Sequence, residues 1–125
     1  MTKDEGQGRR EQCDLEERTA RFGEAIIAFA RQAPATAVTE SLIRELVRSA
    51  THIGASCCQA GDAPSKRQFR NRINVCQRHS RQTQHWLRMI ATAVPEKRDE
   101  ARELWREARD LHLVFASIYQ EKTSN

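Results

Sequence analysis

The chain has 125 residues, of which 38% are hydrophobic and 30% charged, and its formal net charge is +4 at pH 7. This length predicts one domain that buries roughly two-thirds of its chain surface in a single core. We expect neither a signal peptide nor a membrane span, because the opening residues are polar and the most apolar run, Ala25 to Ala30, is too short. The alternating pattern of strands is lacking, so the composition favours a helical protein.

The four cysteines do not predict disulfide bonds. Cys13, Cys57, Cys58 and Cys76 match neither a CxxC pair nor the framework of a secreted domain. Cys57 and Cys58 are adjacent and poorly placed to bond with each other. We therefore expect reduced thiols in a cytoplasmic protein.

The N-terminal third predicts an arm followed by a helix. Residues 1–12 combine glycines with charges and are expected to form a flexible N-terminal arm. Asp14 is a candidate N-cap for the first helix, which is expected to run to about Gln32, before the break at Pro34. A domain over residues 13–121, with a C-terminal tail at 122–125, is the organisation that this pattern favours.

Three more helices follow, separated by short breaks. Thr39 is expected to cap the second helix, which ends at Gly61–Pro64. Ser65 is expected to cap the third helix, which stops near Val94, and the fourth begins near Glu96.

In each of the four segments, apolar or small residues recur in steps of three and four. The expected core residues are Leu15, Thr19, Phe22, Ile26 and Phe29 in the first, Ile43, Leu46, Ala50, Ile53 and Cys57 in the second, Phe69, Ile73, Cys76, Ser80, Thr83, Leu87 and Ile90 in the third, and Ala101, Leu104, Ala108, Leu111, Phe115 and Ile118 in the fourth. This spacing, with short connections, predicts an all-α protein built as an antiparallel up-down four-helix bundle.

The positive charge is concentrated in one segment. From Ala63 to Val94 the chain carries seven of its 21 basic residues and none of its 17 acidic ones. At about 100° per residue, the arginines fall opposite the apolar stripe. The residues on that side are Arg67, Arg70, Arg78, Arg81, Arg88 and His85. Because solvated basic helices usually interleave Glu, this face predicts a polyanionic partner, RNA or DNA; a solvated arginine surface is the alternative.

Apolar residues outside the stripes predict an oligomer. Leu113 and Val114 point away from the stripe of the fourth helix, and Val75 and Trp86 lie on a flank of the third. A helix that is apolar on several faces commonly buries the extra face in another subunit. Isolated surface residues are the alternative.

Other chemistry has weak support in the sequence. Cys76 and His79 have a spacing that can chelate a metal, with Cys57 or His112 as a further ligand, but no second ordered ligand pair follows. We expect no metal, no cofactor and no catalytic residues, because the third helix offers no carboxylate and Gly54 sits mid-helix among Ala and Ser rather than in a phosphate-binding loop. Trp86 and Trp105 are interpreted as anchors of the core or an interface, with base stacking as the alternative.

Three stretches resemble a known family. They are DLEERTARFGEAII at Asp14–Ile27, LVRSATHIGAS at Leu46–Ser56 and RQTQHWLRMI at Arg81–Ile90, with Ser65 and Phe69 in an S-x-x-x-F spacing. They are similar to the four-helix bundle proteins encoded in intervening sequences of bacterial large-subunit ribosomal RNA genes. The accessory proteins of diversity-generating retroelements look similar too.

The resemblance implies a ring-shaped homopentamer without catalytic activity. Its retroelement members carry a basic surface and bind a reverse transcriptase and its template RNA. Gln59, His79 and Gln82 stand where the family has acids, which moves this chain toward the basic members. The sequence thus predicts a non-enzymatic scaffold that binds nucleic acid and serves a reverse transcriptase. The alternative is a protein-interaction module whose arginines bind acidic protein surfaces.

Overall fold

The fold consists of four long helices. The computed structural model describes residues 3–124, which form α1 (Lys3–Arg31), α2 (Ala37–Gly61), α3 (Lys66–Ala93), the 3₁₀ turn η1 (Pro95–Lys97) and α4 (Arg98–Ser124). The described range contains no strand, so the all-α prediction is confirmed. None of its helices combines the length and the apolar character needed to cross a membrane.

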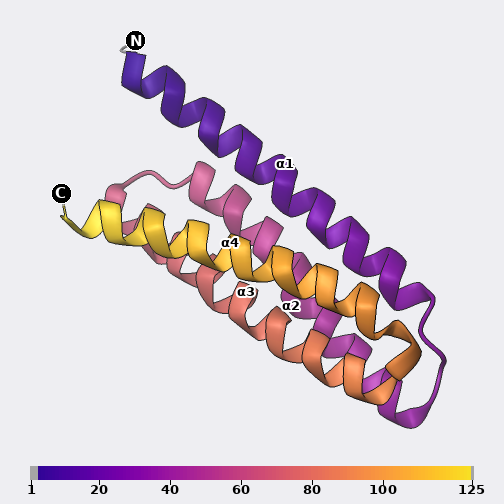
Figure 1. Cartoon of the computed structure of the whole chain (residues 1–125). Coiled ribbons are helices and arrows are strands. Elements are labelled where there is room, and N and C mark those ends of the chain that lie inside the picture. Colours follow the sequence, from indigo (N-terminus) through magenta and orange to yellow (C-terminus); the bar gives the residue numbers. More distant parts are fainter. Residues whose placement is uncertain (1–2, 125) are drawn as a thin grey trace.

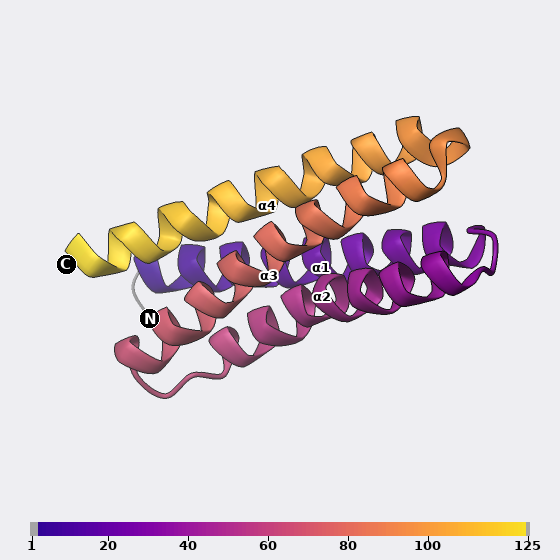
Figure 2. The same ribbon diagram turned by 90° about the horizontal axis from the view of Figure 1, so that it is seen from below.

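The helices run alternately in opposite directions. Both chain ends and the connection between α2 and α3 lie at one end, and the other two connections lie at the opposite end (Figures 1 and 2). α3 packs along both α2 and α4, whereas α1 packs mainly on α2 and touches α4 much less. α3 is therefore the central helix of the contact network.

Two of the predicted ends of helices are wrong. α1 begins at Lys3 rather than near Asp14, so residues 3–12 of the expected arm are helical, while residues 1–2 lie outside the described range. Gly6 and Gly8 each cost a helix only about 1 kcal/mol, which the rest of α1 offsets. Gln12 also donates from Nε2 to the carbonyl oxygen of Cys57 at 2.9 Å, which ties this part of α1 to α2.

At the other end of the chain, α4 continues through residues 122–124, where a tail was expected.

The two capping predictions had different outcomes. Ser65 caps α3 as expected, accepting a hydrogen bond from the backbone N–H of Gln68 at 3.2 Å. α2 is capped by Thr36 instead of Thr39. Thr36 Oγ1 accepts from the Thr39 N–H at 3.1 Å, and Thr39 Oγ1 accepts from the Thr36 N–H at 2.8 Å. Thr39 is thus the reciprocal partner one turn inside a capping box.

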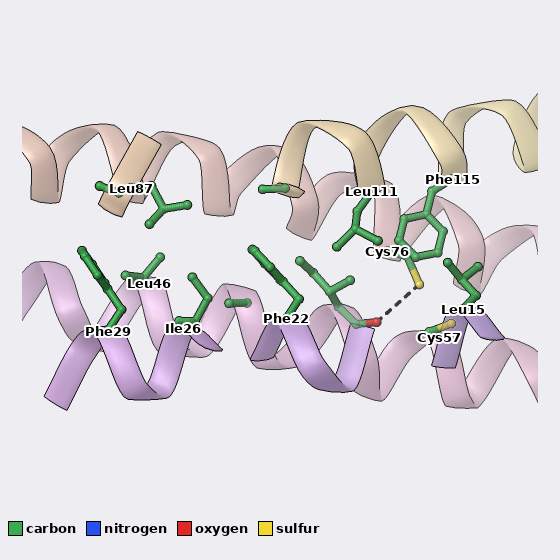
Figure 3. Packing of buried hydrophobic residues seen from close by; sticks show 14 of the residues in the cluster. Leu15, Phe22, Ile26, Phe29, Leu46, Cys57, Cys76, Leu87, Leu111 and Phe115 are labelled. Atoms are coloured by element: carbon green, nitrogen blue, oxygen red, sulfur yellow. Dashed lines mark hydrogen bonds between the residues drawn. The ribbon is translucent and has the colours of Figure 1, made fainter. Parts of the chain in front are cut away.

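The core is made of the predicted stripes. Figure 3 shows Phe22, Ile26 and Phe29 of α1 pointing away from their own helix toward the other side of the core, where Leu87, Leu111 and Phe115 lie. The stripe residues are buried except for four half-buried ones: Ile43, Phe69, Leu104 and Ile118.

Buried hydroxyls in α3 are satisfied locally. Ser80 Oγ donates to the carbonyl of Cys76 at 2.8 Å, and Thr83 Oγ1 donates to that of His79 at 2.7 Å. Thr83 Oγ1 also lies 3.1 Å from Ser49 Oγ of α2. Such back-bonded hydroxyls let small polar residues occupy a core without an unsatisfied group.

Adjacent isoleucines on α1 provide a test of this packing. Ile26 is 0% exposed and Ile27 is 43% exposed. Ile26→Ala should lower the free energy of unfolding by about 2–5 kcal/mol, because it leaves a cavity. Ile27→Ala should change it by less than about 0.5 kcal/mol. Urea denaturation followed by circular dichroism measures both, and equal losses would contradict the orientation of α1.

Candidate nucleic-acid interface

The outer side of α3 presents basic side chains to solvent. Arg67, Arg78, Arg81, Arg88 and His85 are all exposed, as the sequence predicted, and we call them the arginine face. They face outward because α2 and α4 cover the opposite side of α3, where its buried stripe lies. Within the described part of the chain, none of these arginines forms an ion pair. Their charge is therefore available to a ligand.

Arg70 differs from the other predicted arginines. It is half-buried, its guanidinium carbon lies 5.1 Å from the centre of the Tyr119 ring, and Nη2 is 3.4 Å from the Tyr119 hydroxyl. Its Nε is buried without a hydrogen-bond partner. This cation–π contact joins α3 to α4, so the structure places Arg70 between two helices and outside the arginine face.

Two histidine rings, His52 of α2 and His79 of α3, lie next to each other between these helices. The rings of His52 and His79 lie 5.1 Å apart, centre to centre, and are tilted by 34°. Burial is the main cause that lowers the pKa of His79, and the charges of His52, Arg78 and Arg48 add to it. The sequence does not reveal that His52 and His79 are neighbours, because their contact depends on how α2 packs against α3.

The residues whose spacing could chelate a metal do not converge. The thiol of Cys76 lies in the core, 3.7 Å from the carbonyl oxygen of Ile53, while the ring of His79 faces His52. Nδ1 of His112 lies 3.1 Å from a backbone carbonyl oxygen of α3. Over the described residues, no group of three or more His, Cys, Asp or Glu side chains is arranged to hold a metal ion.

A hollow of about 820 Å³ lies between the C-terminal half of α3 and the start of α4. We call it the α3–α4 hollow. Its lining combines a tryptophan and small apolar residues with four arginines: Leu87, Arg88, Ala91, Thr92, Pro95, Arg98, Ala101, Arg102, Trp105 and Arg106. It adjoins the arginine face through Arg88, which belongs to both.

Sequence reasoning missed the arginines that α4 adds to this hollow. Arg98, Arg102 and Arg106 alternate with acids in the sequence, so the segment shows no charge excess. Their i, i+4, i+8 spacing places them on one face of the helix, and that spacing is the signal that was available. Glu107, by contrast, faces α1, where both its oxygens lie 2.9 Å from the guanidinium of Arg18.

The predicted interface residues do not form a single patch. Leu113 is 57% exposed, and it lines a groove of about 560 Å³ between α1 and α4 together with half-buried Val114. Val75 lines a different hollow, beside the connection from α2 to α3. Trp86 is half-buried and packs against the core, with the His85 ring edge-on at 4.9 Å between ring centres. Leu113 is therefore the clearest candidate for a subunit contact.

Comparisons with known proteins identify the fold. No family model and no curated protein matches the chain. A crystal structure of a protein of unknown function from the S23 ribosomal protein family of Bacteroides thetaiotaomicron superposes with a TM-score of 0.75. The match is 19% identical and covers 87% of this chain and 97% of the other. The likeness at this identity concerns the four-helix fold.

The half-buried His79 predicts a pH dependence of stability. Because burial lowers the pKa of His79 below its ordinary 6.5, the folded protein disfavours the charged ring that the unfolded chain accepts. Above pH 6.5 His79 is neutral in both states and does not affect the free energy of unfolding. As the pH decreases through and below that value, the free energy of unfolding should fall. His79→Gln should make this part of the decline shallower, as measured by urea midpoints between pH 7.5 and 5. Parallel declines in the two proteins would contradict the assignment.

Proposed function

We propose that this protein is a non-enzymatic scaffold that binds RNA or DNA through the arginine face. The observation that carries the proposal is that the four arginines of the arginine face are exposed on a helix without any acidic residue, and that none of them is ion-paired in the described structure. Phosphates supply the negative charge that such a surface lacks, and their binding releases condensed counterions.

Each arginine–phosphate contact is expected to be weak, so the affinity comes from several such contacts together. Arginine contacts to phosphate position a nucleic acid but carry little sequence information, so recognition rests on charge and shape. A homo-oligomer repeats the arginine face, and linked contacts gain from the high effective concentration. We propose a homopentamer, which is the assembly that the family resemblance implies, and a reverse transcriptase as the partner that supplies specificity.

The first test removes charge from the centre of the arginine face. Arg78→Gln, Arg81→Gln and Arg88→Gln together keep helix propensity nearly unchanged. Binding to a structured RNA should fall by at least about 100-fold, since three contacts of about 1 kcal/mol each are lost. The slope of log affinity against log salt should become shallower by about 2 to 3. A gel-shift series at several salt concentrations measures both.

A matched triple variant is the control for the loss of three positive charges. Arg9→Gln, Arg10→Gln and Arg44→Gln remove the same charge from exposed positions on α1 and α2 and should keep most of the affinity. Loss of binding only in this control would move the site to those helices. Stronger binding to an acidic protein than to RNA would replace the proposal with a protein-interaction module.

The second test concerns assembly. Leu113→Glu should dissociate the oligomer without unfolding it, because the side chain is 57% exposed and a buried carboxylate opposes association. Light scattering should then give one chain mass of 14.4 kDa instead of a multiple of it. Val38→Glu, at a 62% exposed apolar position on α2, is the control and should leave the mass unchanged. A wild-type protein that is monomeric at micromolar concentration would contradict the assembly.

A further inference from the structure

The α3–α4 hollow has the size of a ligand site. Its volume of about 820 Å³ falls within the range of roughly 300–1,000 Å³ that is usual for bound small molecules. Leu87, Ala91 and Ala101 are apolar lining residues, which we call the apolar floor, and Pro95, the first residue of η1, also lines the hollow. An apolar floor of this kind favours a flat, weakly hydrated group over a fully charged one.

The rim of the hollow is positively charged from both sides. Arg88 approaches it from α3, and Arg98, Arg102 and Arg106 approach it from α4. Of these four, Arg106 alone has an ion-pair partner among the described residues, an exposed Glu103 at 2.8 Å. Like charges at i, i+4 destabilise a helix, so this arrangement is more stable when an anion lies between the guanidinium groups.

Trp105 adds an aromatic surface to the lining of this basic hollow. Its half-buried indole lines the hollow, and the guanidinium carbon of Arg109 lies 5.7 Å from the ring centre. Nucleobases stack on aromatic side chains of this kind, and every base has a suitable face. In a duplex these faces are already stacked on neighbouring bases, so only an unpaired nucleotide offers one.

From these contacts we infer that the α3–α4 hollow holds an unpaired nucleotide of a single-stranded nucleic acid. The base lies against Trp105 and the apolar floor, and the adjoining phosphates contact Arg88, Arg98 and Arg102. The inference rests on the proposed function and adds to it a preference for single strands, which the arginine face on α3 does not provide. Arg88 continues the path of the strand from the hollow onto that face.

Tryptophan fluorescence gives a direct readout. In a Trp86→Phe background, Trp105 is the only tryptophan of the chain. Titration with a short oligothymidylate should quench its emission, and a duplex of equal length should not. Trp105→Leu should weaken binding of the single strand by about 10-fold and leave duplex binding unchanged.

A second variant tests the same inference independently, in case Trp105→Leu does not fold. Arg98→Gln with Arg102→Gln should also weaken single-strand binding and lower its salt slope by about 1.4. Arg31→Gln with Arg44→Gln removes equal charge from exposed positions on α1 and α2 and should not. Circular dichroism checks that all variants keep their helices.

The outcomes separate the two proposals. Equal binding of single strand and duplex, without quenching and without an effect of Trp105→Leu, overturns the inference and leaves the proposed function standing. Binding of neither nucleic acid overturns both. Equal quenching by poly-glutamate overturns the inference too, because it shows that any flexible polyanion fills the hollow.

Discussion

The packing of α3 between α2 and α4 is the constraint on which the other features depend. A helix flanked on two sides must bury a continuous stripe, and in α3 the residues from Ile73 to Ile90 do so with hydroxyls that bond within the helix. Because these small side chains need no partner of opposite charge, the core requires no carboxylate from α3. All its ionisable arginines are left for the outer side or for contacts with α4, as with Arg70.

Charge is used differently on the two sides of the molecule. Where α1 meets α4, the guanidinium of Arg18 and the carboxylate of Glu107 form a bidentate pair across helices that otherwise touch little. On the arginine face of α3, the arginines are exposed and have no such partner in the described structure. The first arrangement neutralises charge to join helices, and the second leaves it unneutralised at the surface. Only the second is suited to an external polyanion.

The sequence predicted the core well and the ends and hollows poorly, for physical reasons. A buried stripe follows from the helical period alone, so Leu46, Ile73 and Phe115 could be assigned without knowing their neighbours. The start of α1 depends on the weak penalty of two glycines and on a hydrogen bond to α2, neither of which has a local signature. The basic rim of the α3–α4 hollow was hidden because Arg102 belongs to a segment with balanced charge, and only tertiary packing sets it opposite Arg88.

The four thiols differ in reactivity because two of them are exposed and two are buried. Cys13 and Cys58 are exposed, whereas Cys57 and Cys76 are buried, and burial raises the pKa of Cys57 to about 11. Since the thiolate is the reactive species, the buried pair resists alkylation and oxidation as long as the helices stay together. The rate at which an alkylating reagent consumes these two thiols therefore measures how often the folded chain opens, with the exposed pair as an internal reference.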